Sequence, residues 1–252
     1  MLPVLTSRPI VLCYHAVSET WTHPLSVTPE VLERHLSTFL HRGYLPVRAD
    51  RLLREGGRLL HVTFDDGFRS VRNALPVLER LNVPTTVFVC SAYADDGRPF
   101  DKLPGGVTET DPSEIETLDW DGLRALINSG VEIGSHTQHH PYLTSLPDSD
   151  LMRELSLSRE RIETELGQPC RFVAYPYGDS DTRVEAAARA AGYAGAFRAS
   201  GPDARQDRYA FPRTTARASD TPFRLRLRSS RLAGTSIAAR GRRRLAMYLS
   251  HR

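Results

Sequence analysis

Short apolar runs alternate with longer amphipathic stretches along most of this chain. The runs are rich in Val, Ile, Leu and aromatic residues and are bounded by polar or turn-forming residues, a pattern typical of buried parallel strands. The predicted strands are Ile10 to Tyr14, Leu59 to Phe64, Thr85 to Val89, Val131 to Gly134, Arg171 to Ala174, Gly195 to Phe197 and Tyr209 to Pro212.

Helices are expected in the intervals between these strands. Apolar residues recur there at spacings of three and four, which predicts helices over Pro29 to Arg42, Ser70 to Leu81, Asp148 to Leu166 and Asp181 to Ala191. A further helix should begin after Asp119, a good N-cap, and end near Gly130. Trp120 beside this cap is expected to serve packing.

The order of the elements predicts an α/β fold in which parallel strands form a sheet or a barrel. The 252 residues suffice for one large domain, and no Pro/Gly/Ser-rich linker divides them. We therefore expect a single domain over residues 1–223.

The net charge of +3 is unevenly distributed. Residues 221–252 contain nine arginines and no acidic residue, which leaves 24 basic against 30 acidic residues elsewhere. We expect residues 224–252 to form a basic tail that is either disordered or an amphipathic segment in contact with anionic lipid or an acidic partner. Nucleic-acid binding is not expected, because the tail offers only Phe223 and Tyr248 for stacking and lacks a recognisable nucleic-acid module.

Neither secretion nor a membrane span is expected from the chain as it stands. The N-terminus has no basic start followed by a long apolar stretch, and no apolar run approaches the roughly 20 residues of a membrane helix. Cys13, Cys90 and Cys170 are widely spaced and form no C-x-x-C pair, which argues against a disulfide framework or a thiolate zinc site. These patterns favour a cytoplasmic protein, peripheral at the membrane if the tail binds lipid.

Chemically active residues follow the predicted strands. His15, the pair Asp65 and Asp66, His136 and the segment Tyr175 to Tyr177 each come directly after an apolar run or within two residues of it. The C-terminal ends of parallel barrel strands open on one face, so these four segments should converge there.

Carboxylates and imidazoles together make a metal-ligand set. Adjacent residues at a strand end point in different directions, so one aspartate can bind a metal while the other moves protons. If the residues after Gly134 form a helical turn, His136 and His140 lie on one side of it and complete a two-histidine, one-carboxylate site. A metal held in this way lowers the pKa of bound water from about 16 to roughly 7, which suits amide hydrolysis.

Three segments resemble motifs of a known family. Thr63 to Gly67, Gly134 to Pro141 and Ala174 to Gly178 are similar to the first three motifs of the polysaccharide deacetylase family, the NodB-homology group or carbohydrate esterase family 4. The resemblance covers roughly residues 8 to 215. It implies a distorted parallel (β/α) barrel with its active site at the strand C-terminal ends, and removal of an N-acetyl group from an N-acetylated amino sugar.

The resemblance also implies roles for single residues. Asp65 would be the catalytic base, while Asp66, His136 and His140 would bind a divalent metal, usually Zn²⁺. The backbone N–H of Tyr177 would stabilise the oxyanion. His139 does not fit the ligand spacing and is expected to be exposed or to support a ligand.

The chain departs from the family pattern at two places. The third motif usually carries an arginine two residues before its proline, where this chain has Ala174; we expect Arg213, after another predicted strand, to supply that charge. The late Leu-x-His motif is absent from the C-terminal region. Instead, Leu12 to His15 resembles members in which this strand stands at the N-terminus, which makes His15 the candidate general acid.

Other functions remain compatible with these patterns. The same chemistry would serve an amidohydrolase acting on a small non-sugar amide, and the same fold would serve a non-catalytic carbohydrate-binding protein. A two-histidine, one-aspartate set also suits a non-heme Fe(II) oxygenase, but the helical stretches oppose the double-stranded β-helix of such enzymes. The sugar, its chain length and the oligomeric state remain open.

Overall fold

The computed structural model describes residues 8–103, 111–199 and 207–229. Strands predicted from the apolar runs are present with similar bounds, and three further pairs of residues form short strands. The strands are β1 Ile10–Tyr14, β2 Ala16–Val17, β3 Ser26–Val27, β4 Leu45–Pro46, β5 Leu59–Phe64, β6 Thr85–Val89, β7 Glu132–Ser135, β8 Phe172–Ala174, β9 Gly195–Ala199 and β10 Phe211–Thr215.

Seven of these strands close into a parallel barrel. Their order is β1, β5, β6, β7, β8, β9 and β10, and β1 pairs with both β10 and β5. The short strand β4 pairs with the start of β5, and β2 pairs with β3. The predicted (β/α) barrel is therefore confirmed. It is a different architecture from the double-stranded β-helix that an Fe(II) oxygenase of the alternative kind would need.

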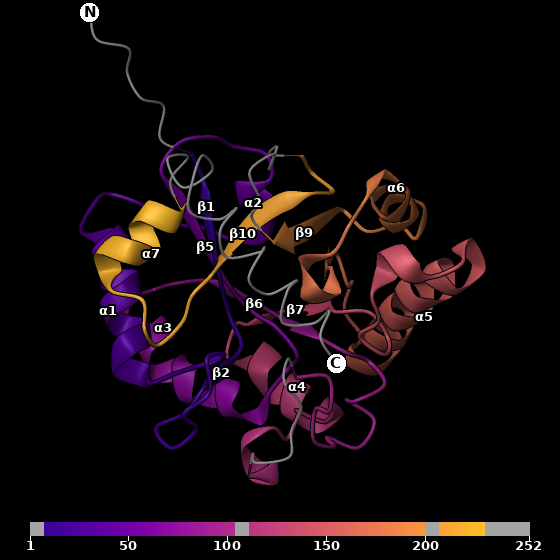
Figure 1. The fold of residues 1–252 in the computed structure, drawn as a ribbon, viewed down its shortest axis with the longest axis horizontal. Coiled ribbons are helices and arrows are strands. Elements are labelled where there is room, and N and C mark those ends of the chain that lie inside the picture. Colours follow the sequence, from indigo (N-terminus) through magenta and orange to yellow (C-terminus); the bar gives the residue numbers. More distant parts are fainter. Residues whose placement is uncertain (1–7, 104–110, 200–206, 230–252) are drawn as a thin grey trace, which may run out of the picture.

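Helices surround the barrel in the ribbon view (Figure 1). Asp119 caps α4 as predicted, because its carboxylate accepts a hydrogen bond from the Gly122 amide. Asp181 caps α6 through the amide of Val184. The α-helices are α1 Pro29–Leu40, α2 Ala49–Leu52, α3 Leu75–Arg80, α4 Trp120–Asn128, α5 Asp148–Leu166, α6 Thr182–Ala190 and α7 Pro222–Ser229, and the 3-10 turns are η1 Arg69–Ala74, η2 Pro112–Glu114, η3 Leu143–Ser145 and η4 Pro176–Gly178.

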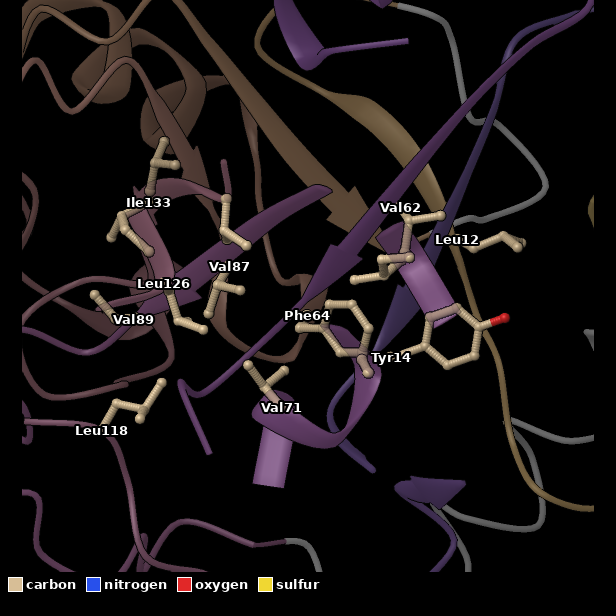
Figure 2. Close-up of a cluster of buried hydrophobic side chains, with 14 of the residues drawn as sticks. Leu12, Tyr14, Val62, Phe64, Val71, Val87, Val89, Leu118, Leu126 and Ile133 are labelled. Atoms are coloured by element: carbon tan, nitrogen blue, oxygen red, sulfur yellow. The ribbon is translucent and has the colours of Figure 1, made fainter. Parts of the chain in front are cut away.

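The side chains of each barrel strand alternate between two apolar layers, as the two-residue period of a strand requires. Outward side chains pack under the helices: Figure 2 shows Phe64 of β5 next to Val71 of η1, Val62 of β5 next to Leu12 of β1, and Val87 of β6 next to Leu126 of α4. Inward side chains fill the barrel, and the largest are Phe88, Phe172, Phe197 and Phe211. The barrel is therefore a packed core, and only its mouth is free for chemistry.

The C-terminal part of the fold extends beyond the predicted domain end. Residue 223 falls inside α7, and Leu225 of this helix is fully buried. Asp220 anchors the helix by pairing with Arg228, Nη1 to Oδ2 at 2.5 Å. Residues 230–252, which make up the rest of the predicted basic tail, lie outside the described residues. Within the described part of the chain, no helix is long and apolar enough to cross a membrane.

Candidate active site

Four strained residues cluster at the C-terminal mouth of the barrel. Asp66, Thr137, His140 and Tyr177 have φ angles of 68°, 69°, 60° and 58°, in the left-handed region that non-glycine residues seldom adopt. Each such residue costs about 1–3 kcal/mol and persists only where the surrounding structure holds it. Of the non-glycine residues with positive φ in the described segments, only Asn82 lies elsewhere. Backbone strain is therefore concentrated where the chemistry was predicted.

Asp66, His136 and His140 form one buried cluster. Asp66 Oδ1 lies 3.6 Å from Nε2 of His136 and 3.4 Å from Nε2 of His140. The three side chains are at most 6% exposed. Each offers one ligand atom, and these atoms all lie within 4.8 Å of one another. The geometry is that of three groups facing a common point.

His136 is oriented by the backbone of β8. Its Nδ1 lies 2.7 Å from the carbonyl oxygen of Ala174, so Nδ1–H donates and the lone pair of Nε2 faces Asp66. The backbone carbonyl of Ala174 thus orients His136, as the carbonyl of any residue at this position would.

The charges of this cluster suit a cation. Burial, followed by the neighbouring charge of Asp65, raises the pKa of Asp66 well above its ordinary value. Burial, followed by the charge of His136, lowers the pKa of His140 to about 2. The imidazole of His140 is therefore neutral at neutral pH. Asp66 Oδ1 is buried and has no hydrogen-bond partner in the structure. An orphaned carboxylate oxygen between two neutral imidazole nitrogens fits a divalent metal ion, whose charge would offset the burial of Asp66.

The segment that carries the two histidines is not the helical turn expected from their spacing. Thr137 and His140 are both in the left-handed region, and the amide of His140 donates to Thr137 Oγ1 at 3.1 Å. Two serines stabilise this bend: Ser135 Oγ accepts from the Thr137 amide at 3.1 Å, and Ser158 Oγ donates to the Thr137 carbonyl at 3.0 Å. The histidines therefore converge through a strained loop, a conformation that periodicity alone does not indicate.

Asp65 is paired with an arginine that lies far from it in the sequence. Arg213 donates from Nη1 to Oδ1 at 2.6 Å and from Nη2 to Oδ2 at 2.8 Å, and both side chains are 4% exposed. Burial by itself would raise the pKa of Asp65, but the charges and hydrogen bonds of Arg213 outweigh it and hold that pKa below the ordinary value. Asp65 is thus ionised, whereas Asp66 beside it has no such partner.

Arg213 lies within β10 and not at the end of a strand as its sequence suggested. The strand begins later than predicted, at Phe211, and runs on to Thr215. Phe211 and Arg213 are two residues apart and point into the barrel together. There the guanidinium lies 5.4 Å from the ring centroid of Phe88 and donates to Thr63 Oγ1 at 3.1 Å.

His15 follows β1 and lies beside Asp65. One ligand atom from each of Cys13, His15 and Asp65 lies within 4.8 Å of the other two. This second cluster is a poor metal site, because the guanidinium of Arg213 already neutralises its only carboxylate. Burial lowers the pKa of His15 to about 4 despite the attraction of Asp65. His15 Nδ1 is buried and has no hydrogen-bond partner in the structure.

Two rings border the cluster of Asp66, His136 and His140. Tyr177, whose backbone was the predicted oxyanion donor, packs edge-on against His140 with ring centroids 4.5 Å apart. Phe100 packs against the same imidazole at 5.1 Å. His139, by contrast, points away, since its Nδ1 pairs with Glu154 at 2.7 Å on the surface. Trp120 is buried and donates to Asp95 at 2.9 Å, which agrees with the packing role expected of it.

Two residues of the site were missed. Cys13 donates from Sγ to Asp65 Oδ2 at 3.3 Å. Residues two apart in a strand lie on the same face, so the position of Cys13 two residues before His15 could have predicted its place in the site. Phe100 lies in the connection between β6 and η2, far from any motif, and no sequence signal pointed to it.

Known proteins are similar to this chain in sequence and in fold. A family model described as polysaccharide deacetylase matches residues 54–196. The putative polysaccharide deacetylase YxkH of Bacillus subtilis is 24% identical over 191 residues, which are 73% of this chain and 61% of YxkH. The chitooligosaccharide deacetylase of Sinorhizobium fredii is 29% identical over 126 residues, 49% of this chain and 48% of that enzyme. The chain thus spans about half to three fifths of these relatives.

Solved structures share the fold. The Streptococcus pyogenes deacetylase PplD in complex with acetate superposes with a TM-score of 0.73 at 17% identity, over 89% of this chain and 99% of its own. A de-N-acetylase from Aggregatibacter actinomycetemcomitans superposes with a TM-score of 0.70 at 22% identity, over 88% and 100%. His15 and Arg213 lie outside the residues that the family model matches.

Proposed function

Because this chain belongs to the polysaccharide deacetylase family, we propose that it is a metal-dependent hydrolase that removes the N-acetyl group from an N-acetylated amino sugar. The products are acetate and a free amine, and the substrate is a glycoside, a glycolipid or a polysaccharide precursor. The observation that carries the proposal is that two adjacent carboxylates, Asp65 and Asp66, have different partners. Asp65 is ion-paired with Arg213, whereas Asp66 Oδ1 faces two imidazole nitrogens and has no hydrogen-bond partner in the structure.

Asp66, His136 and His140 would hold the metal, and their one oxygen and two nitrogen ligand atoms suit Zn²⁺. When bound, such an ion polarises a carbonyl group and lowers the pKa of water. His136 keeps its Nε2 available because Nδ1–H is engaged by the Ala174 carbonyl.

Asp65 takes the proton from the attacking water. The bidentate contact with Arg213 keeps the carboxylate ionised and fixes its orientation, and Oδ2 lies 3.9 Å from His136 Nε2, close to the metal cluster. A base held in this way is available without rearrangement. The amide N–H of Tyr177, whose backbone is fixed in the left-handed region, stabilises the charge that develops on the carbonyl oxygen.

His15 protonates the leaving amine. It lies on the same side of the mouth as Asp65, and burial lowers its pKa to about 4. The imidazole is therefore neutral at rest near neutral pH and readily gives up a proton that it takes up during the reaction. Asp65 and His15 therefore lie side by side at the reacting bond, one to receive a proton and one to deliver it.

An assay of acetate release tests the proposal. The purified protein, loaded with Zn²⁺, is incubated with N-acetylglucosamine oligosaccharides, an N-acetylated glycolipid and small linear amides, and Asp65→Asn is assayed in parallel. Acetate from a sugar substrate, lost in the variant, is the expected result. Release from small amides alone would replace this function with that of an amidohydrolase, and release from none would overturn it.

A further inference from the structure

Charge is distributed unequally between the two ends of the barrel. The connections that leave the strand C-terminal ends form the mouth, and the described ones contain thirteen acidic residues and three basic ones. The connections that enter the strands form the opposite end, which we call the bottom face, and the described ones contain eight arginines and three acidic residues. The barrel is therefore negative at its mouth and positive at its bottom face.

The two sets of connections follow from the bounds of the helices and strands. The mouth comprises residues 15–28, 65–68, 90–103, 111–119, 136–147, 175–181 and 216–221. The bottom face comprises residues 8–9, 41–58, 81–84, 129–131, 167–171, 191–194 and 207–210. Helix α2 belongs to the bottom face and strand β2 to the mouth, and Figure 1 shows them at opposite ends of the barrel. The charge separation thus runs from one end of the barrel to the other.

Most of the positive charges at the bottom face are not neutralised by the fold. Arg51 pairs with Glu55 at 2.8 Å, and Arg54 pairs with Asp50 at 2.7 Å. These pairs engage two of the three carboxylates of this face. No ion pair within the described residues engages four of its exposed arginines, which are Arg42, Arg48, Arg58 and Arg208. Their charges are therefore available to an anionic partner.

Helix α7 adds a further charge beside this face. Burial raises the pKa of Tyr44, and the charges of Arg58 and of Arg226, an arginine of α7, both oppose that shift. Arg58 also donates from Nη1 to the Arg42 carbonyl at 2.9 Å. The neighbouring Leu45, whose amide donates to the Arg58 carbonyl at 2.7 Å, is 48% exposed. One apolar side chain thus stands in water among three arginines.

The sequence after α7 carries charge of the same sign. The helix ends at Ser229, and residues 230–252 contain six more arginines and no acidic residue. Leucine, isoleucine, methionine and tyrosine stand among these arginines. Basic and apolar residues in such a mixture are typical of protein segments that bind a membrane surface. The composition of this segment therefore agrees with the charge and the apolar residue of the bottom face.

An anionic lipid surface fits these features better than a nucleic acid does. An arginine close to acidic headgroups strengthens binding about fivefold, and Leu45 can enter the apolar layer beneath them, which a nucleic acid does not offer. The same surface repels the acidic mouth. We propose that the bottom face of the barrel docks on an anionic membrane and that the mouth faces away from it. Docking of this kind does not depend on the reaction at the mouth.

Binding to vesicles tests the docking. The full chain is mixed with vesicles of phosphatidylcholine, either alone or with about one third phosphatidylglycerol, at about 0.05 M and about 0.3 M salt. Wild type should bind only the acidic vesicles, and less tightly at the higher salt. The double variant Arg42→Gln and Arg58→Gln should bind them about tenfold or more weakly. The double variant Arg98→Gln and Lys102→Gln removes the same charge from the mouth and should match wild type.

Two further variants separate docking from general attraction, after melting curves show that every variant is folded. Arg42→Lys with Arg58→Lys keeps the charge and should bind as wild type does. Leu45→Ser should bind acidic vesicles at least about threefold more weakly and a single-stranded oligonucleotide no differently. Equal losses in the bottom-face and mouth variants would overturn the proposal, and so would unchanged vesicle binding by Arg42→Gln with Arg58→Gln or by Leu45→Ser. Loss of oligonucleotide binding alone would assign the bottom face to a nucleic acid.

Discussion

Arg213 donates two hydrogen bonds to the carboxylate of Asp65, at 2.6 and 2.8 Å, although the two residues are 148 positions apart in the chain. A planar guanidinium matches a carboxylate in this geometry, and both groups are buried. The pair therefore fixes the direction of the carboxylate as well as its charge.

Replacing Arg213 should damage both stability and turnover. Arg213→Ala leaves a buried carboxylate without its partner, and we expect the free energy of unfolding to fall by about 3–5 kcal/mol. Arg213→Lys keeps a charge but cannot make the bidentate contact, so it should fold and yet lose at least about tenfold in kcat. Urea unfolding and acetate release measure the two effects. Arg98→Lys, at an exposed pair with Asp96, is the control, and full turnover in Arg213→Lys would contradict the orienting role.

Metal content should depend on Asp66 and His140 but not on the neighbouring His139. Asp66→Asn and His140→Ala each remove one of three converging ligand atoms, and we expect metal affinity to fall by at least about 100-fold. His139→Ala is a matched control, because His139 pairs with Glu154 on the surface.

The measurement is bound Zn²⁺ after dialysis, together with the rise in Tm on adding Zn²⁺, since a ligand that binds only the folded state stabilises it. If the wild-type protein neither retains Zn²⁺ nor gains Tm, the metal site does not exist. If His139→Ala loses as much Zn²⁺ as Asp66→Asn and His140→Ala, the assignment of the ligands is wrong.

His15 should matter for proton transfer and not for the metal. We expect His15→Ala to lower kcat by about 100-fold or more, in the range of general acid catalysis, while the bound metal per protein stays at the wild-type value. The rate is measured by acetate release and the metal by elemental analysis of the same samples. Loss of metal in His15→Ala would transfer His15 to the ligand set, and an unchanged kcat would exclude it from catalysis.

Acid should destabilise the fold through His61. This imidazole lies inside the barrel, with Nδ1 2.8 Å from the Val47 carbonyl and Nε2 3.0 Å from Thr86 Oγ1. Burial lowers its pKa from 6.5 to about 4, so the unfolded chain binds a proton first as the pH falls. The stability contributed by the neutral form is complete above pH 6.5 and is lost between 6.5 and about 4.

The loss from this one residue amounts to about 3 kcal/mol, from the size of the shift. Urea unfolding of the metal-free protein across that range measures it. His61→Asn retains a donor toward the Val47 carbonyl but does not titrate, so its stability should fall less steeply with pH. A slope equal to that of wild type would assign the acid sensitivity to other histidines.

Gly134 should tolerate no side chain. A Cβ there would lie 2.5 Å from the ring of Phe88 and 3.0 Å from the Phe172 carbonyl oxygen. Gly134→Ala would displace the ring that packs against Arg213, so we expect a loss of about 1–3 kcal/mol in the free energy of unfolding and a lower kcat. Gly56→Ala, with no atom within 4 Å of its Cβ, is the control. Equal stability of the two variants, measured in urea, would refute the crowding.

The pattern of apolar and polar residues along the chain predicted most of the strands and helices. The apolar runs at β1, β5 and β6 were predicted with their observed bounds, and so was α5, because strand and helix periods are written in consecutive residues. The grouping of His15, Asp65 and His136 at one mouth also followed from the sequence, since all parallel strands end there. Their chemical roles remain predictions that the experiments above address.

The sequence by itself determined which residue types stand at the strand ends, and hence the fold class and the candidate chemistry. Only the tertiary structure decided which carboxylate is neutralised, because a guanidinium from β10 reaches Asp65 while Asp66 meets two imidazoles. It also decided how those imidazoles converge, through left-handed residues at 137 and 140 where a helical turn was expected. Ion pairing and backbone strain depend on contacts between distant segments, and these come into being only when the barrel closes.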